Sequence, residues 1–278
     1  MRLSVHYDTH YVYSEPARKV IQLLRLTPLG FPGQNVLDWR IDVDRDVGLR
    51  EGRDGYGNIT HMLYIDDLVD SVKISVTGRV LTEDRSGVVE GLPNDLPPQI
   101  FLRDTPLTHP GPGLHDLAAA LDQQRGTTLD KLHRLTAAIH TRMTFDTDRT
   151  EADTSATDAF SAGHGVCQDF AHIFIAVARA ARIPARYVSG HLFRRDGSAS
   201  QEASHAWAEA WIEDLGWVGF DPTNGICADD AYIRVAGGLD YRDAAPFVGA
   251  RNGGGREELS VQVQVRLART QSQSQSQS

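Results

Sequence analysis

The spacing of the hydrophobic residues of this chain differs on the two sides of a proline-rich stretch. From residue 3 to about 82 they recur at every second position, which places apolar side chains on one face of a strand and polar ones on the other. One such run consists of Leu37, Trp39, Ile41 and Val43, with charged residues between them. The stretch RDGYGN that follows carries the Asp-Gly and Gly-Asn pairs that suit a tight turn. The pattern predicts an antiparallel β domain over residues 1–92.

Six of the twelve prolines fall between Pro93 and Pro112, where fixed φ angles and missing N–H donors work against helices and central strands. We interpret residues 93–112 as a connection between domains. After it, hydrophobic residues recur at the three- and four-residue spacing of amphipathic helices, in two sets. These are Leu114, Leu117 and Leu121, then Leu129, Leu132, Leu135 and Ile139. A third apolar stripe predicts a helix from residue 166 to about Pro184, with Cys167 in its first turn.

The last part of the chain returns to strand-like patterns. Strands are predicted at 186–193, 205–212 and 217–221, and a final strand lies within 258–269. A solitary strand is not stable, so the final one should rejoin an existing sheet, for which the N-terminal sheet is the candidate. The polar end QSQSQSQS is predicted to be disordered over residues 270–278. The chain is therefore expected to be an α+β protein, with its mixed core at 113–257.

Composition and charge exclude several classes of protein. The 278 residues carry a formal charge of -9 and have no block of lysine or arginine, so nucleic acid is not an expected partner. No apolar run approaches the roughly 20 residues that a membrane helix needs, and the alternating N-terminus does not read as an export signal. Two cysteines are too few for a disulfide scaffold. A soluble, cytoplasmic protein is expected.

Cys167 lies in the stretch GHGVCQDF, where chemistry and burial compete as explanations. The N-terminus of a helix favours the thiolate, which is the nucleophilic form of cysteine. Glycines on either side of His164 let the backbone approach a carbonyl closely, so amides near Cys167 are candidates to face an oxyanion. Free cysteine is nevertheless among the most buried residue types, so the local sequence alone favours an inert thiol.

A second element, SHAWAEAW, has an all-alanine face when it is read as a strand. Ala206, Ala208 and Ala210 share that face, while His205 belongs to the other one with Trp207. Small side chains permit a helix to pack closely, which would bring His205, at the start of the strand, to the helix that carries Cys167. A buried histidine with a satisfied hydrogen bond is the plainer interpretation of any isolated His.

A third element, GWVGFDPTNG, places Asp221 at the end of a strand that should pair with the SHAWAEAW strand through a short hairpin. His205 and Asp221 share a face only if the loop has an odd length, such as 212–214 or 213–215. Asp221 would then accept a hydrogen bond from the imidazole and fix its tautomer. The alternative is that the carboxylate only closes an Asx-type turn.

Together the three stretches, HGVCQDFAHIFIAVARAARIPARYVSGHL, SHAWAEAWI and GWVGFDPTNG, strongly resemble the bacterial transglutaminase-like family of the papain-like cysteine-enzyme superfamily. The resemblance covers residues 112–225, and more loosely the whole chain, since members often carry an N-terminal β domain and a last strand after the core. It implies a core in which a helix-borne cysteine packs on an antiparallel sheet, and a catalytic triad of Cys167, His205 and Asp221. One departure is His164, where members more often have a basic or other polar residue.

The resemblance implies acyl transfer at an amide bond through a thioacyl intermediate, without a cofactor. We favour hydrolysis of a peptide-like substrate or amide exchange, with crosslinking, amine incorporation or a catalytically silent binding module as alternatives. Beside the triad, the candidates for substrate binding or the oxyanion site are Gly165, Val166, Gln168 and Trp207.

The other histidines and the second cysteine are candidates for a metal site or for a redox role. His164, Cys167 and His172 lie close in sequence but lack the paired spacing of zinc ligands, so no metal is predicted. A disulfide between Cys167 and Cys227 would block the nucleophile, but an unpaired thiol is the expected state in a reducing compartment. No oligomeric state is assigned.

Overall fold

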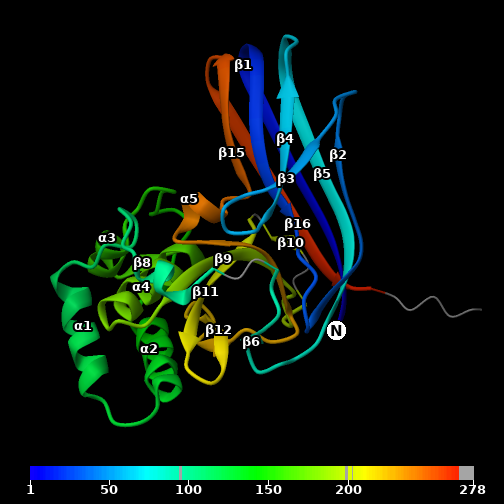
Figure 1. Ribbon diagram of the computed structural model, residues 1–278. Coiled ribbons are helices and arrows are strands. Elements are labelled where there is room, and N and C mark those ends of the chain that lie inside the picture. The colour runs from blue at the N-terminus through cyan, green and yellow to red at the C-terminus, as the bar shows by residue number, and fades with distance from the viewer. Residues whose placement is uncertain (94–95, 198–199, 202, 269–278) are drawn as a thin grey trace, which may run out of the picture.

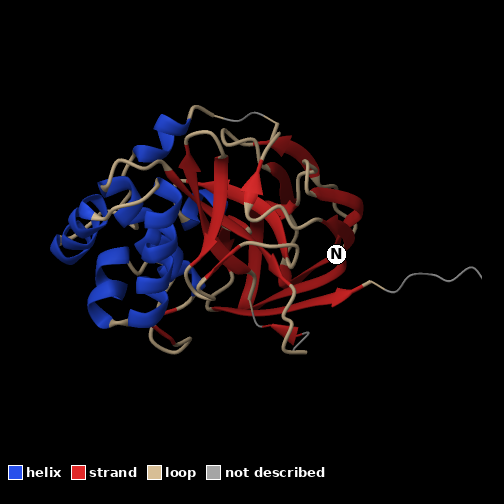
Figure 2. Ribbon diagram, turned by 90° about the horizontal axis from the view of Figure 1, so that it is seen from below, coloured by secondary structure: helices blue, strands red, loops and turns tan. Residues whose placement is uncertain are grey.

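The computed structural model describes residues 1–93, 96–197, 200–201 and 203–268. It contains two bodies side by side: a tall all-β body and a mixed body in which helices cover a second sheet (Figure 1). Seen from below, the helices gather at one side of the molecule and the strands at the other (Figure 2). The α+β class predicted from the sequence is confirmed. The predicted disordered segment 270–278 lies outside the described residues.

The all-β body is one eight-stranded sheet that folds back on itself. Its strands are β1 (Arg2–Thr27), β2 (Gln34–Val43), β3 (Arg50–Arg53), β4 (Ile59–Ile65), β5 (Val69–Thr82), β15 (Phe247–Gly253), β16 (Glu257–Leu267) and the short β10 (Ser200–Gln201) beside β16. The alternating pattern of β5 buries every second residue, as the period of two predicts. Neighbouring strands of this sheet run antiparallel to one another.

Strand β1 belongs to both layers of this body because it bends near Ser14–Pro16. Its first half pairs with β5 and β16, and its second half pairs with β4 and β15. Inward side chains of the two halves meet in a common core, in which Leu3 and Tyr7 of the first half join Leu24 of the second. The result is a two-layer sandwich, in which β15 and β16 lie along the edge beside the mixed body (Figure 1).

The mixed body is a curved antiparallel sheet with a helical layer. Its strands run in the order β13 (Ile226–Cys227), β12 (Gly216–Asp221), β11 (His205–Ile212), β9 (Ala185–Leu192) and β14 (Tyr232–Gly238), and β6 (Val88–Val89) pairs with β12. Its helices are α1 (Pro112–Gln123), α2 (Thr128–Arg142), α3 (Ala156–Ala162), α4 (Cys167–Ala180) and α5 (Tyr241–Ala244). A 3-10 helix, η1 (Pro98–Leu102), and a small parallel pair, β7 (Thr144–Phe145) with β8 (His164–Gly165), complete the set.

Helix α4 is the central helix of the mixed body. It contacts α1, α2 and α3 on one side and strands β9 and β11 on the other, so almost all of its side chains are buried. The alanines of β11 face this helix, and Ala206, Ala208 and Ala210 lie in the same core as Phe170 and Phe174. Small residues on the strand let the helix approach closely, which holds the start of α4 beside the start of β11.

The chain crosses between the two bodies more than once. The short strand β6 joins the sheet of the mixed body before the proline-rich segment begins. The chain returns to the sandwich at Phe247, ahead of the final strand within 258–269. That final strand, β16, pairs with β1 over its whole length. No helix among the described residues has the length and apolarity that crossing a bilayer requires.

Candidate active site

Cys167 is the first residue of α4, and the loop before it is held by a buried carboxylate. Asp169 Oδ2 accepts hydrogen bonds from the backbone amide of Val166 and the hydroxyl of Thr150, both at 2.8 Å. Gly165 is required by this arrangement, because a Cβ at its position would lie 2.5 Å from the same oxygen. The first helical turn leaves amides without acceptors inside the helix, and those of Cys167 and Gln168 belong to that turn.

His205 and Asp221 meet across the hairpin of β11 and β12. The loop is 213–215, since Ile212 pairs with Gly216, and this is one of the two odd-length loops that the sequence allows. An odd loop keeps His205 and Asp221 on one face of the sheet. His205 Nε2 lies 2.6 Å from Asp221 Oδ2, and both side chains are buried. The register of the hairpin therefore places the His205 imidazole in direct contact with the Asp221 carboxylate.

The carboxylate of Asp221 accepts five hydrogen bonds. Oδ2 accepts from His205, from the hydroxyl of Tyr232 at 2.7 Å and from the Asn224 amide at 2.7 Å. Oδ1 accepts from the backbone amides of Thr223 and Asn224 at 2.9 and 3.2 Å. The Asx-type turn and the histidine contact, which the sequence offers as alternatives, are both present.

Electrostatics favour a charged pair at this contact. Burial alone would lower the pKa of His205, but the charge and hydrogen bond of Asp221, together with an interaction with Cys167, raise it to about 10. For Asp221, burial raises the pKa, but His205 and the hydrogen bonds from Asn224 and Tyr232 outweigh it and lower the value. Both shifts act in the direction that favours an imidazolium paired with a carboxylate.

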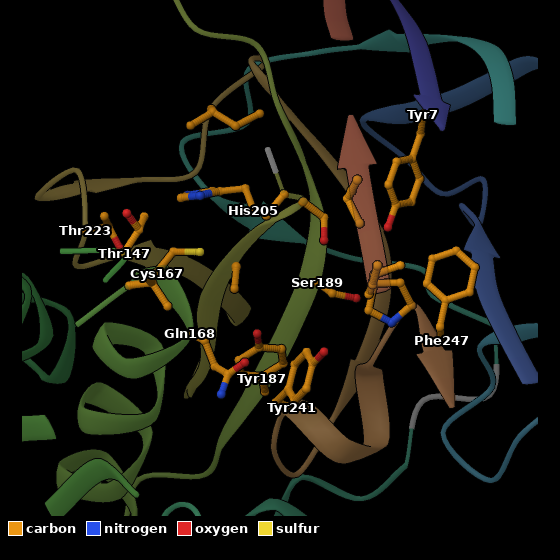
Figure 3. A pocket seen from close by; sticks show the side chains of 18 of the residues that line it. Tyr7, Thr147, Cys167, Gln168, Tyr187, Ser189, His205, Thr223, Tyr241 and Phe247 are labelled. Atoms are coloured by element: carbon orange, nitrogen blue, oxygen red, sulfur yellow. The ribbon is translucent and has the colours of Figure 1, made fainter. Parts of the chain in front are cut away.

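Cys167 and His205 line one cavity of about 1280 Å³. Figure 3 shows them on the same side of this cavity, with Tyr7 and Phe247 on the opposite side and Ser189 between. Because Nε2 of His205 is engaged by Asp221, Nδ1 is the ring nitrogen left to interact with the thiol. The thiol is half-buried, so a ligand in the cavity can reach it. The arrangement suits attack by sulfur on an electrophilic carbon, with a histidine beside it to carry the proton.

The other predicted site residues take different places. Val166, like Gln168, lines the cavity, but the Gln168 amide nitrogen donates to the carbonyl of Ala152 at 3.0 Å, which holds that side chain in the loop beside α3. Gly165 serves the close approach of Asp169. Trp207 lies outside this cavity: it is buried behind His205, where its ring stacks at 6.3 Å from the imidazole. Its ring supports His205 from the far side, and a substrate contact for Trp207 stays a prediction.

The histidines and the second cysteine weighed for a metal do not converge. His172 Nε2 accepts the Tyr241 amide at 3.1 Å, while His191 packs between Tyr7 and Trp39. Cys227 lies on β13, opposite Phe220 of β12, with its sulfur 4.0 Å from Nδ1 of His133. Among the residues that the structure describes, no three His, Cys, Asp or Glu side chains form a group suited to a metal ion, and both cysteines are free thiols.

Three residues at the site escape the sequence reasoning. Tyr232 and Asn224 donate to Asp221, and Tyr187 lines the cavity beside Gln168 (Figure 3). Asn224 is visible in the sequence as part of the turn after Asp221. Tyr232 comes from β14, which is separated from β11 by β9, so no local pattern connects it to Asp221.

Comparison with known families gives two matches, one to each body. Residues 115–222 match the model of the transglutaminase-like superfamily, and residues 3–81 match the model of the bacterial transglutaminase-like N-terminal region. The first match spans Cys167, His205 and Asp221.

Similar proteins occur in mycobacteria. An uncharacterized protein of Mycobacterium leprae is 31% identical over 281 residues, covering 94% of this chain and 96% of that protein. An uncharacterized protein of Mycobacterium tuberculosis is 30% identical over 275 residues, covering 89% of this chain and 87% of its own length. A protein-glutamine gamma-glutamyltransferase of Pseudomonas aeruginosa is 33% identical over 87 residues, which are 29% of this chain and 12% of that enzyme.

One solved structure shares the whole architecture. The crystal structure of a candidate cysteine protease from Cytophaga hutchinsonii superimposes with a TM-score of 0.78 at 25% identity, covering 97% of this chain and 91% of that one. Both bodies and their mutual arrangement therefore recur in another protein.

Proposed function

The chain belongs to the transglutaminase-like superfamily, whose fold supports thiol-dependent chemistry at amides, and we propose that it transfers acyl groups through Cys167, His205 and Asp221. The observation that carries this proposal is the buried 2.6 Å contact between His205 and Asp221. His205 lines the same cavity as Cys167, which lies at the start of a helix. A histidine oriented by a buried carboxylate beside a nucleophile is the arrangement that acyl transfer requires.

The reaction begins with Cys167 as the thiolate and its proton on the His205 imidazolium. The thiolate Sγ attacks the amide carbon, which forms a C–S bond and places the electron pair of the C=O π bond on the carbonyl oxygen. The first-turn amides of Cys167 and Gln168 are the donors available to that oxyanion. When the tetrahedral intermediate collapses, the C–N bond breaks and the His205 imidazolium gives its proton to the departing amine. A thioacyl enzyme and a neutral imidazole remain, with Asp221 holding the ring in place.

Water completes the reaction in the form that we favour, which is hydrolysis of a peptide-like substrate. Neutral His205 takes a proton from water, the hydroxide oxygen attacks the thioester carbon, and Cys167 leaves as the thiolate. The half-buried thiol in an open cavity supports access of water to the thioester. A primary amine in place of water would give transamidation by the same steps. The cytoplasmic location, and the absence of nucleic-acid and membrane partners, stay predictions.

Alkylation of the intact protein tests the nucleophile, because the chain carries its own reference thiol. Burial raises the pKa of Cys227 to about 11, so this thiol should react slowly at neutral pH. We expect iodoacetamide at pH 7 to label Cys167 at least tenfold faster than Cys227, and we expect His205→Ala to remove most of that difference. The label is located by mass spectrometry. Equal rates at the two thiols, unchanged in His205→Ala, would mean a catalytically silent module.

Partition of a trapped acyl enzyme decides between hydrolysis and transfer. A p-nitrophenyl ester forms the thioacyl enzyme with release of a coloured product, and the acyl group is then offered water alone or water with a primary amine. We expect the free acid as the main product at low millimolar amine. A dominant amide product under those conditions would assign the chain to transamidation.

A further inference from the structure

The cavity that contains Cys167 does not end at the catalytic residues. It continues from the mixed body into the open edge of the sandwich, between β15 and β16, where Tyr7, Tyr11 and Tyr13 line it. Its volume of about 1280 Å³ exceeds the roughly 300–1,000 Å³ of pockets that enclose a drug-sized molecule. A small amide would leave most of this space empty.

The tyrosines form a row on one face of β1, which we call the tyrosine row (Tyr7, Tyr11 and Tyr13). Their odd numbers place them on the inward face, and the ring of Phe247 from β15 contacts the first two at 6.1 and 6.0 Å between ring centres. Six residues of strand span about 20 Å, so the row is longer than any single side chain. Its far end lies at Arg251 and Glu257, which form an ion pair at 3.0 Å.

Two buried polar atoms on the wall of the cavity have no partner among the described residues. They are Oε1 of Gln22 and the hydroxyl of Tyr13, whose residues are 6% and 5% exposed. The absence of a side chain at Gly249 makes room for Gln22, since a Cβ there would lie 2.9 Å from its Cγ. Buried polar groups in proteins are nearly always satisfied, so exceptions that face a cavity indicate a polar ligand. Gln22 Oε1 needs a donor, and the Tyr13 hydroxyl can donate or accept.

The main chain beside the cavity is also available. Within the part of the chain that the structure describes, β15 pairs with β1 along one side only, and its residues Gly249 and Ala250 line the cavity. A free strand edge presents N–H and C=O groups that an extended peptide can pair with. A polypeptide supplies both groups at every residue.

We propose that the acyl donor is an extended polypeptide, and that it runs from Cys167 along the tyrosine row to Gln22 and Tyr13. The edges of the tyrosine row, whose residues are 3–5% exposed, form the floor of this path. A backbone or side-chain N–H satisfies Gln22 Oε1, and the sandwich thereby becomes half of the substrate site. This inference deepens the proposed function and rests on it for the role of Cys167. A glycan also stacks on aromatic rows, but the reacting bond is an amide and the free β15 edge matches a peptide backbone.

Binding by the Cys167→Ala protein tests the proposal without any turnover. Fluorescein-labelled random-sequence peptide pools of two and of eight residues are titrated and followed by fluorescence anisotropy. We expect the eight-residue pool to bind at least tenfold tighter, because two extended residues span only about 7 Å and cannot cover a row of about 20 Å. Equal affinities for the two pools, or tighter binding of maltohexaose than of the longer pool, would overturn the proposal.

Two conservative variants then locate the contact. In the same Cys167→Ala background, Gln22→Met and Tyr13→Phe should each weaken binding of the eight-residue pool by about five- to tenfold, which is the size of one lost hydrogen bond. Their unfolding midpoints should stay level or rise, because each change removes an unsatisfied buried atom. The matched control is Tyr64→Phe on the exposed face of β4, which should bind as the parent does. Unchanged affinity in both test variants contradicts the assignment.

Protection of the thiol connects the row to the catalytic residues. In the unmodified chain, the eight-residue pool should slow alkylation of Cys167 at least fivefold and leave Cys227 unaffected. Tight binding without protection would place the peptide away from Cys167 and refute the inference. A Cys167 that reacts no faster than Cys227 without peptide would instead refute the proposed function, so the two failures are distinguishable.

Discussion

Asp221 shows how one side chain can serve the fold and the site together. Its Oδ1 closes the turn through the amides of Thr223 and Asn224, which fixes the carboxylate before any histidine is considered. Its Oδ2 is then presented to His205 with Tyr232 and Asn224 as further donors. Because the carboxylate is held from both oxygens, the imidazole is oriented by a rigid partner.

Replacement of Asp221 by asparagine should reverse the charge state of His205. The amide removes the negative charge and leaves burial, so the pKa of His205 should fall from about 10 to below its ordinary value of about 6.5. The Nδ2 donor of the new amide also favours the tautomer with the proton on Nδ1, and acyl transfer should drop about 10³- to 10⁴-fold. An NMR titration of the histidine ring carbons checks the pKa.

The matched control for this change is Asp214→Asn, an exposed residue of the same hairpin whose φ of 70° asparagine tolerates. The control should leave the titration of His205 and the activity unchanged. If His205 still titrates near pH 10 in Asp221→Asn, another group stabilises the imidazolium.

At the residue scale, the sequence predicts those contacts that depend on local register. The hairpin needs an odd loop for His205 to reach Asp221, and a helix start follows from the apolar stripe after Cys167. Tyr232 and the tyrosine row could not be predicted in this way. Tyr232 reaches the site through the pairing of β14 with β9, in which it lies opposite Leu192, 40 residues away in the sequence. The tyrosine row reaches it through the pairing of β1 with β16, in which Tyr13 lies opposite Glu257.

Strand β11 organises its surroundings through its two faces. Its alanines pack against α4. Glu209, on the opposite face, lies fully buried between Arg186 of β9 and Arg234 of β14. The distances are 2.6 Å from Arg186 Nε and 2.9 Å from Arg234 Nε. One carboxylate thus ties three neighbouring strands together behind the active site.

Neutralisation of this carboxylate should destabilise the sheet. Glu209→Gln leaves two buried guanidinium groups around a neutral amide, and removal of one partner of a buried ion pair costs about 3–5 kcal/mol. Urea unfolding at pH 7 measures the effect. The exposed Glu213→Gln, four residues along the same hairpin, should stay within about 0.5 kcal/mol of the parent. A loss below about 1 kcal/mol for Glu209→Gln would show that the arginines find other partners.

Strands with a clear alternation, such as β5 from Val72 onward, are predicted from the sequence, and β9, β11 and β12 are predicted although almost all of their residues are buried. Strand β14 is not predicted. Its sequence, YIRVAGG, is buried at every position, so no period of two is visible. The register shift between Arg234 and Ala236 breaks the pattern further. Strands buried on both faces cannot be distinguished from other short apolar segments by periodicity.

Two side-chain amides of the sandwich join it to strand β14 of the mixed body. Gln34 of β2 donates to the carbonyl of Arg234 and accepts from its amide, at 2.8 and 2.7 Å. Asn58 makes the same paired contact with Gly237, at 2.8 Å in both directions. Two side-chain amides of the sandwich therefore extend the main-chain pairing of β14. This rigid junction is what allows a cavity shared by both bodies to keep its shape.

His191 lies in this junction and makes its stability sensitive to acid. Its ring contacts Tyr7 at 5.8 Å and Trp39 at 6.1 Å, and burial lowers its pKa to about 4. In the unfolded chain a histidine takes up a proton near pH 6.5, whereas folded His191 does so only near pH 4. Unfolding therefore binds a proton between these values, and stability falls as the pH is lowered. His205 acts in the opposite window, because its stabilising effect is lost only as the pH rises toward about 10.

His191→Phe should flatten this acid response. Nδ1 of His191 has no partner among the described residues, so phenylalanine should fit between the same two rings with little change at pH 7. Between pH 7 and pH 4.5 the parent should lose about 2–3 kcal/mol more than the variant, at roughly 1.4 kcal/mol for each pH unit below 6.5. Urea unfolding at the two pH values gives the difference, with the exposed His10→Phe as control. Equal losses in parent and variant would show that His191 is already protonated in the folded junction, and the acid response would then belong to buried His172, whose pKa is lowered to about 3.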